Sequence, residues 1–181
     1  MTAITLPESL KNIDGEAFYN CKSLTSVRIP DNVEEIGEGT FTACVKLNSL
    51  ILSEKLRYIG ASAFYSCSDL STIVCNALVP PRKSPYATKT GGYLSTDVFY
   101  NVNKQHCKLY VPEGCEEAYR AAELWKDFNI MEMGTGINEM RNEGVRREKY
   151  TNEIYDLQGR QLPQAPQKGV YIQNGKKVAV K

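Results

Sequence analysis

Six cysteines and a single histidine are the residues of this chain most able to do chemistry. Three of the cysteines, Cys21, Cys44 and Cys67, follow one another at intervals of 23 residues. In stacked parallel units such residues lie about 4.8 Å apart with parallel side chains, which suits neither a disulfide nor the tetrahedral ligand set of zinc. We therefore expect a buried column of free thiols that holds no metal and packs as small apolar side chains.

The other reactive residues do not assemble a catalytic site in the sequence. Cys75 is expected to point inward, whereas Cys107 and Cys115 are less constrained and a disulfide at Cys107 remains open. His106 precedes Cys107 directly, and neighbours on an extended segment point to opposite faces, so they are badly placed to share a proton. The sequence also lacks a phosphate-binding glycine loop, a paired-cysteine zinc motif and a Gly-x-Ser-x-Gly elbow. It predicts a protein that is not an enzyme and needs no cofactor.

The interval of 23 residues organises most of the chain. Three coils follow one another over residues 4–26, 27–49 and 50–72, and a closing unit extends over residues 73–133. A fixed period of this length indicates stacked supersecondary units, so the sequence predicts a solenoid. The repeated positions are expected to form the core, because a single coil cannot bury them alone. Besides the cysteines they are Ile13, Ile36, Ile59; Phe18, Phe41, Phe64; and Leu24, Leu47, Leu70.

Within a coil, the residue types alternate in a way that indicates one short strand. Val27–Ile29 has two apolar residues around a polar one, and Pro30 ends the strand because proline donates no ladder hydrogen bond. We expect the chain to turn at Gly37 and Gly60. Asp14 takes the glycine position in the first coil, where aspartate tolerates left-handed backbone geometry.

The pattern L-T-S-V-x-I-P-x-x-V-x-x-I-G-x-x-x-F-x-x-C, best kept in residues 24–44, resembles the BspA-like (Treponema pallidum-type) leucine-rich repeat. The resemblance covers about residues 2–133. It implies a right-handed curved solenoid with a parallel sheet on its concave face, and adhesion to host or bacterial proteins. Residues 73–133 are similar to that family's closing unit at Pro80-Pro81, Phe99, Leu109-Tyr110-Val111-Pro112, Glu117-Ala118-Tyr119, Trp125, Phe128 and Ile130.

The closing unit contains a predicted helix over residues 115–128. Glu116 and Glu117 suit the positive N-terminal end of a helix, and one face of the helix is apolar. We expect this helix to cover the open edge of the last coil. Trp125, the only tryptophan, is expected to plug the core rather than to stack on a ligand.

After residue 133 the composition changes. Residues 134–152 are polar and charged and are predicted to be a linker. In the tail, residues 153–181, Asn174-Gly175 separates two alternating runs, which is a strong signal for a β-hairpin. The tail is similar to the C-terminal segments of many secreted Bacteroidales proteins and to the end of type IX secretion sorting domains.

One column of residues is predicted to face outward from the concave sheet. The period places Thr5, Arg28, Ile51, Val74 and Tyr110 in this column, with Ala3, Ser26, Ser49 and Thr72 beside it. Tyrosine and arginine often anchor interfaces, and grouped exposed apolar residues often mark a contact. The alternative is that β-branched residues occupy the strands for conformational reasons and bind nothing.

The loop over residues 82–96 is the second candidate site, since it carries Tyr86 and Tyr93 and is longer than a turn between coils requires. A loop of this composition is equally expected to be disordered. Both candidates point to a macromolecular partner.

The charge balance and the chain's start bear on partner and location. Lys and Arg (22) nearly equal Asp and Glu (21), which argues against nucleic acid. No apolar run approaches the length of a membrane span, and residues 1–10 do not form a signal peptide. Because the chain starts partway into a coil, we expect a truncation before Met1. We predict a secreted or surface-displayed bacterial protein that binds another protein; the alternative is a structural module that self-associates or packs with a larger parent chain.

Overall fold

The computed structural model describes residues 3–85 and 96–133, and, in the tail, the backbone of residues 154–155, 161–162, 169–173 and 176–180. The chain divides into two compact units, Met1–Arg141 and Asn142–Lys181. The first unit is a solenoid of parallel strands with about five turns, which confirms the predicted fold class.

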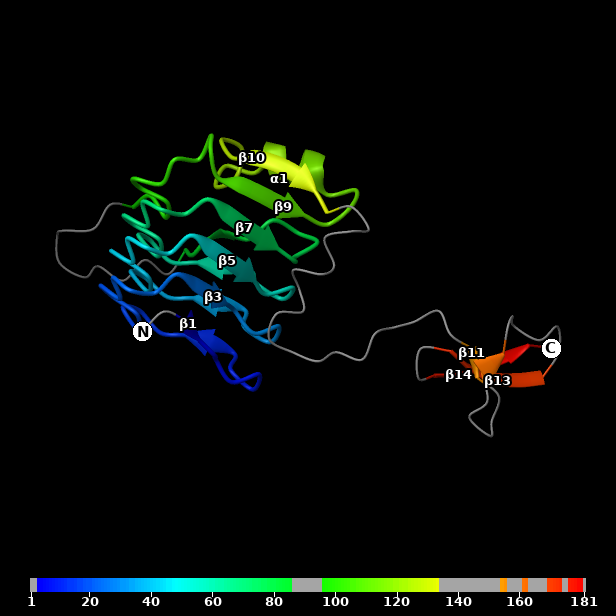
Figure 1. Ribbon diagram of the computed structural model, residues 1–181. Helices are drawn as coiled ribbons and strands as arrows, with labels where there is room; N and C mark the ends of the chain where they lie inside the picture. The colour runs from blue at the N-terminus through cyan, green and yellow to red at the C-terminus, as the bar shows by residue number, and fades with distance from the viewer. Residues whose placement is uncertain are drawn as a thin grey trace. The chain divides into compact units, whose positions relative to one another are not determined.

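Each turn contributes one strand to a six-stranded parallel sheet with the order β1-β3-β5-β7-β9-β10 (Figure 1). Residues at the same repeat position pair across neighbouring strands, so that Ser49 lies opposite Ser26 on one side and Thr72 on the other. Because side chains alternate along a strand, Leu50 and Leu52 point into the core and are fully buried. The strands are β1 (Ala3–Ile4), β3 (Ser26–Arg28), β5 (Ser49–Leu52), β7 (Thr72–Cys75), β9 (Lys108–Val111) and β10 (Asn129–Glu132).

A second parallel sheet, which the sequence analysis did not predict, forms one more side of the turns. Its order is β2-β4-β6-β8. The isoleucines that were expected only as core positions lie in paired strands, with Ile36 opposite both Ile13 and Ile59. The sequence did not reveal these strands because two residues are too few to show the alternation of apolar and polar side chains that marks a strand. The strands are β2 (Asn12–Ile13), β4 (Glu35–Ile36), β6 (Tyr58–Ile59) and β8 (Arg82–Lys83).

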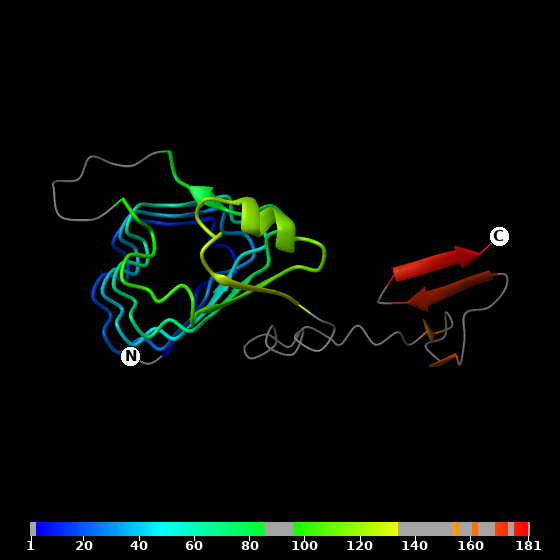
Figure 2. The ribbon, with the colours of Figure 1, turned by 90° about the horizontal axis from the view of Figure 1, so that it is seen from above.

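The segments around the repeated phenylalanines form a third ladder of hydrogen bonds between turns. The backbone N–H of Phe18 donates to Thr40 O at 2.9 Å, and that of Phe41 donates to Ala63 O at 2.8 Å. Backbone groups of the first three turns are thus each paired with the next turn on three sides. Figure 2 looks along these turns and shows them superposed.

This third ladder requires left-handed backbone geometry at two positions of each turn. The prediction that Asp14 adopts this geometry is wrong, because positive φ occurs two residues later, at Glu16, and again at Asn20. Few of these residues are glycine, so their types give little warning of the conformation. The left-handed residues of the turns are Glu16, Gly39 and Ser62 in one column, and Asn20, Ala43, Ser66 and Asn101 in the other.

Gly37 and Gly60 directly precede turns of the chain, and they also allow neighbouring coils to approach closely. A Cβ atom on Gly37 would lie 2.4 Å from the backbone nitrogen of Gly15, and one on Gly60 would lie 2.4 Å from that of Glu38. Asp14 occupies the same repeat position but follows the edge strand β2, so no earlier turn faces it within the described residues. Glycine is therefore required only where a turn packs against its predecessor.

The phenylalanine rings stack through the centre of the solenoid, as the period predicts. Phe41 lies 5.1 Å from Phe18 and 5.4 Å from Phe64, centroid to centroid, and the rings are almost parallel. Phe99 continues the stack at 5.3 Å. Trp125 then closes it at a tilt, and its indole N–H donates to Pro81 O at 2.8 Å. Trp125 is fully buried and fills the core at the C-terminal end.

The predicted helix over residues 115–128 is too long. Helix α1 covers Glu116–Ala121 only, and Ala122 is extended with ψ 125°. The break lets the following turn direct both Trp125 and Phe128 at Phe99, with centroid distances of 5.4 and 5.1 Å. The helix also does not cover the sheet edge by itself, because β10 pairs with β9 and continues the sheet.

The second unit contains a four-stranded antiparallel sheet in the order β12-β11-β13-β14. Gln173 pairs with Lys176, which confirms the predicted hairpin across Asn174-Gly175. The predicted boundaries at residues 133 and 152 stay predictions. The strands are β11 (Ile154–Tyr155), β12 (Gln161–Leu162), β13 (Gly169–Gln173) and β14 (Lys176–Val180).

The close approach at Gly60 gives a direct test of the stacking. Gly60→Ala should lower the free energy of unfolding by about 1–3 kcal/mol, because the added Cβ meets backbone that cannot move independently. Gly15→Ala is the matched control, since its Cβ would lie 3.0 Å from Glu38 O and should cost less. Urea unfolding curves of both variants measure the difference. Equal stability of the Gly60 variant and the unchanged chain would contradict the proposed contact.

Candidate binding surface

The structure brings four of the predicted site residues into one column on the outer face of the six-stranded sheet. Arg28 pairs with Ile51, Ile51 with Val74, and Val74 with Tyr110. Thr5 follows β1 directly and is exposed. The period of 23 residues connects Arg28, Ile51 and Val74, whereas Tyr110 lies 36 residues after Val74 and joins the column because β9 pairs with β7.

Met131 extends the column by one strand, and sequence analysis missed it. It lies opposite Tyr110 in β10 and is 41% exposed. No repeat spacing connects β10 to the earlier strands, because helix α1 and its turn intervene. We call Ile51, Val74, Tyr110 and Met131 the apolar column.

The apolar column is less exposed than the sequence predicted. Val74 was expected to contribute to an exposed patch, but only 3% of its surface is accessible. It lies between Ile51 and Tyr110 on the adjacent strands, and a central residue on a sheet loses surface to both neighbours. Ile51 and Tyr110 are themselves half-buried. The accessible part of the column is therefore its C-terminal end, at Tyr110 and Met131.

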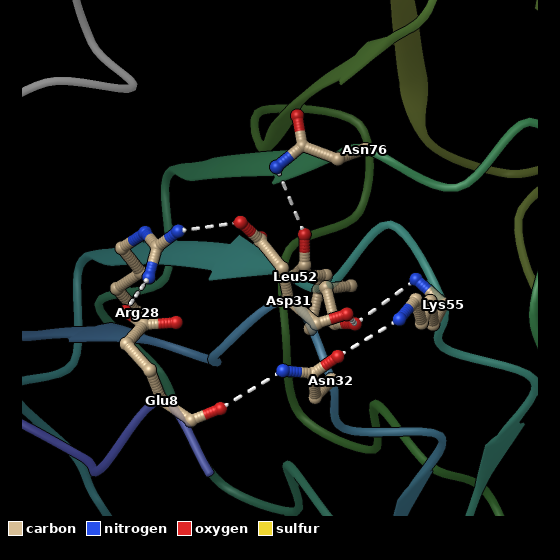
Figure 3. Close-up of polar contacts among 8 residues, drawn as sticks. Glu8, Arg28, Asp31, Asn32, Leu52, Lys55 and Asn76 are labelled. Carbon is tan, nitrogen blue, oxygen red and sulfur yellow. Dashed lines mark hydrogen bonds and ion pairs between the residues drawn. The ribbon is translucent and has the colours of Figure 1, made fainter. Parts of the chain in front are cut away.

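Arg28 is held in place by two carboxylates at the other end of the column. Its guanidinium lies 2.8 Å from Glu8 Oε1 and 3.0 Å from Asp31 Oδ2 (Figure 3). Asp31 follows in the same turn, whereas Glu8 comes from the turn before. The two ion pairs fix a planar donor group at the sheet margin, and the positive charge is balanced locally.

Further hydrogen bonds link the turns beside Arg28. Asn32 Nδ2 donates to Glu8 O at 3.0 Å, and Lys55 Nζ donates to Asn32 Oδ1 at 2.8 Å (Figure 3). Ser53 and Asn76 take the repeat position of Pro30, and their side chains donate to backbone carbonyls of the preceding turn. The carboxyl ends of the strands are thus fastened to one another, which makes this margin of the sheet rigid.

A polar column runs beside the apolar one in the same sheet. Its residues pair in register from β3 to β10, and its last two members are exposed. The outer face of the sheet therefore carries a polar strip and an apolar strip side by side. The polar column consists of Ser26, Ser49, Thr72, Lys108 and Asn129.

All six cysteines are free, and four of them are buried. Cys44 Sγ donates to Phe18 O at 3.2 Å, and Cys67 Sγ donates to Phe41 O at 3.2 Å, so each thiol bonds to the preceding turn. Burial raises the pKa of Cys44 to about 11 and also raises the pKa of Cys67. The predicted buried column is wrong for Cys21, which is exposed because it lies in the first turn.

The remaining cysteines also have structural environments. The hydroxyl group of Tyr119 donates to Ala77 O at 2.7 Å and lies 3.1 Å from Cys75 Sγ. Burial raises the pKa of Cys75 to about 11 and that of Cys107 to about 12. Cys107 is buried while His106 is exposed. The segment is not extended as predicted, because both backbone N–H groups donate to Asn103 O in a turn that precedes β9.

The second candidate site predicted from the sequence is the loop over residues 82–96. Its tyrosines, Tyr86 and Tyr93, lie outside the described residues.

In the described part of the chain, no group of three or more His, Cys, Asp or Glu side chains is arranged to hold a metal ion. The described residues also include no helix with the length and apolar character needed to cross a bilayer.

A solenoid with a regular, extended outer surface belongs structurally to the repeat proteins that offer such surfaces to partners. Residues 1–80 match the sequence model of the family described as BspA type Leucine rich repeat region (6 copies). The coils of this stretch therefore resemble BspA-type repeats, as the period of 23 residues predicts, and repeats of this kind are protein-interaction modules.

Among solved structures, the chain is similar to the crystal structure of the T. pallidum Leucine Rich Repeat protein, with 23% sequence identity and a TM-score of 0.39. The match covers 75% of this chain and 53% of that protein, so the chain spans about half of its length. No curated protein matches the chain.

The thiol environments predict a two-class pattern of reactivity. In the native chain at neutral pH, Cys21 and Cys115 should react with a thiol reagent, because both are at least partly exposed. Cys44, Cys67, Cys75 and Cys107 should react only on unfolding, since burial disfavours the reactive thiolate. Mass spectrometry after timed alkylation identifies the labelled residues, and Cys21→Ser should remove one fast site. Rapid labelling of Cys67 would contradict the packing described above.

Proposed function

We propose that this chain is a non-enzymatic protein-binding module that uses the outer face of the six-stranded sheet. The observation that carries the proposal is the in-register column from Arg28 to Met131, with its accessible end at Tyr110 and Met131. Tyrosine, methionine and arginine are enriched at protein interfaces. The sheet fixes their positions before a partner arrives, so little conformational entropy is lost on binding.

The arrangement of the face also supports a protein partner. The apolar column can bury against a partner's apolar side chains, while Lys108 and Asn129 on the adjacent polar column can form hydrogen bonds at the rim. Arg28, neutralised by Glu8 and Asp31, adds a rigid polar end to the column. A face that alternates polar and apolar strips suits a folded protein surface better than a uniformly charged polymer.

The proposed setting is the surface or the exterior of a bacterial cell. The resemblance of the repeats to the BspA type and the similarity of the tail to type IX sorting segments support this location. The proposed partner is a protein on a host or bacterial surface. The second candidate is a structural module that packs with copies of itself or with a parent chain. The edge strand β1 favours it, because the partly buried Ile4 and Phe18 lie in the first turn.

Substitutions at the accessible end of the apolar column test the proposal. Tyr110→Ser and Met131→Ser should each weaken adhesion of the labelled chain to host epithelial or bacterial cells by about tenfold, the loss expected for an interface anchor. Lys108→Ser and Asn129→Ser are the matched controls, since they lie on the same strands at the polar column and should change adhesion less.

Two controls show whether a loss of adhesion comes from unfolding or from a change in self-association. Circular dichroism checks that the variants stay folded, and light scattering over a range of concentrations reports the oligomeric state. Unchanged adhesion in folded Tyr110 and Met131 variants would contradict the sheet-face proposal. A concentration-dependent increase in mass that Met131→Ser abolishes would favour the structural alternative.

A further inference from the structure

The most exposed large apolar side chains in the described residues lie away from the sheet face, in the turn between β7 and β8. Leu78 is 71% exposed and Val79 is 76% exposed. They border a depression of about 660 Å³. Its apolar lining residues are Leu56, Ala77, Leu78, Val79, Pro80 and Pro112.

A one-residue change of register explains why these side chains point outward. Thr72 in β7 lies opposite Ser49, 23 residues earlier, but Arg82 in β8 lies opposite Tyr58, 24 residues earlier. The turn between β7 and β8 therefore contains one more residue than the turn before it. Counted from β7, Val79 takes the repeat position of Leu56, which is 2% exposed, whereas counted back from β8 that position falls on Pro80. The change of register thus lies at the exposed Val79.

The enlarged turn is nevertheless held firmly at both ends. The Tyr119 hydroxyl donates to Ala77 O at 2.7 Å, and the Trp125 indole N–H donates to Pro81 O at 2.8 Å. Both donors are buried aromatic residues of the closing unit. Leu78, Val79 and Pro80 lie between these two anchor points. The apolar side chains are thus presented by a fixed turn, which reduces the entropy lost when a partner binds.

The charged residues around the depression are mainly basic. Lys55, Arg57 and Arg82 line it, against a single carboxylate from Glu54. The two arginines belong to neighbouring turns, and their guanidinium carbons lie 5.9 and 5.8 Å from the centroid of the same Tyr58 ring. Arg57 approaches Glu34 only at 3.9 Å, and Arg82 forms no ion pair within the described residues.

We propose that this depression is a second binding site. It binds a peptide segment of a partner protein in which an apolar residue is flanked by aspartate or glutamate. An aliphatic or aromatic side chain of the segment packs against Leu78, Val79 and Pro80. Neighbouring aspartate or glutamate side chains accept hydrogen bonds from Arg57 and Arg82, whose planar donor groups match a carboxylate. The site is separate from the outer face of the sheet and does not depend on the function proposed for that face.

Selection from a random peptide library displayed on phage tests the proposal. The full chain is immobilised, and the library is first depleted on the Leu78→Ser/Val79→Ser double variant, whose changes are exposed and should not disturb folding. We expect enrichment of segments with an apolar residue flanked by Asp or Glu. Binding of a selected synthetic peptide should fall by about tenfold in Arg82→Gln, the effect of losing one charge-assisted contact, and should weaken as salt is raised.

Met131→Ser separates this site from the sheet face, because it removes an exposed apolar side chain elsewhere and should leave peptide binding unchanged. Arg57→Glu/Arg82→Glu should shift the selected peptides from acidic to basic. The proposal would be overturned if no peptides were enriched on the full chain after the library had been depleted on the double variant. It would also be overturned by selected peptides that lack acidic residues, or by self-association that the double variant abolishes, which would make a second copy of the chain the occupant.

Discussion

Close backbone contact between successive turns is the constraint on which the rest of the structure depends. Gly37 and Gly60 admit the neighbouring turn to a distance that any Cβ atom would prevent. At that distance, three sets of hydrogen bonds join each of the first three turns to the next: two parallel sheets and the ladder around the phenylalanines. The same approach sets the ring spacing of the Phe18–Phe99 stack. The core and the backbone pairing are therefore consequences of one geometric condition.

The register that follows from this contact also arranges the surface. Where the strands of the six-stranded sheet pair in register, from Arg28 to Tyr110, outward side chains align in a straight column and shield one another, so that Val74 is buried on a nominally exposed face. Where one residue is added, before Arg82, the side chain of Val79 is exposed. The column on the sheet face thus arises from continued strand pairing, and the depression arises at the extra residue between β7 and β8.

The period of the sequence predicted the solenoid, its inward columns and the outward column at Arg28, Ile51 and Val74, because parallel pairing without shifts gives residues of one repeat position the same place in successive turns. Tyr110 lies 36 residues after Val74, so its place in the column does not follow from the period. The period did not predict the second sheet, whose two-residue strands are too short to show alternation. Met131 was missed because β10 follows the closing helix and has no fixed spacing from β9. The end of α1 at Ala121 could not be predicted either, since it depends on how Trp125 and Phe128 reach Phe99.

Native-state hydrogen exchange of one turn tests the central claim most directly. The amides of Ile29, Gly37 and Phe41 belong to the same coil and donate to Ile51 O, Ile13 O and Ala63 O on three different sides. If stacking of whole turns stabilises the solenoid, the three amides should exchange through one cooperative opening with the same free energy and the same denaturant dependence. Fast exchange at Phe41 while Ile29 stays protected would show that the third ladder is not part of that unit, and would contradict the account.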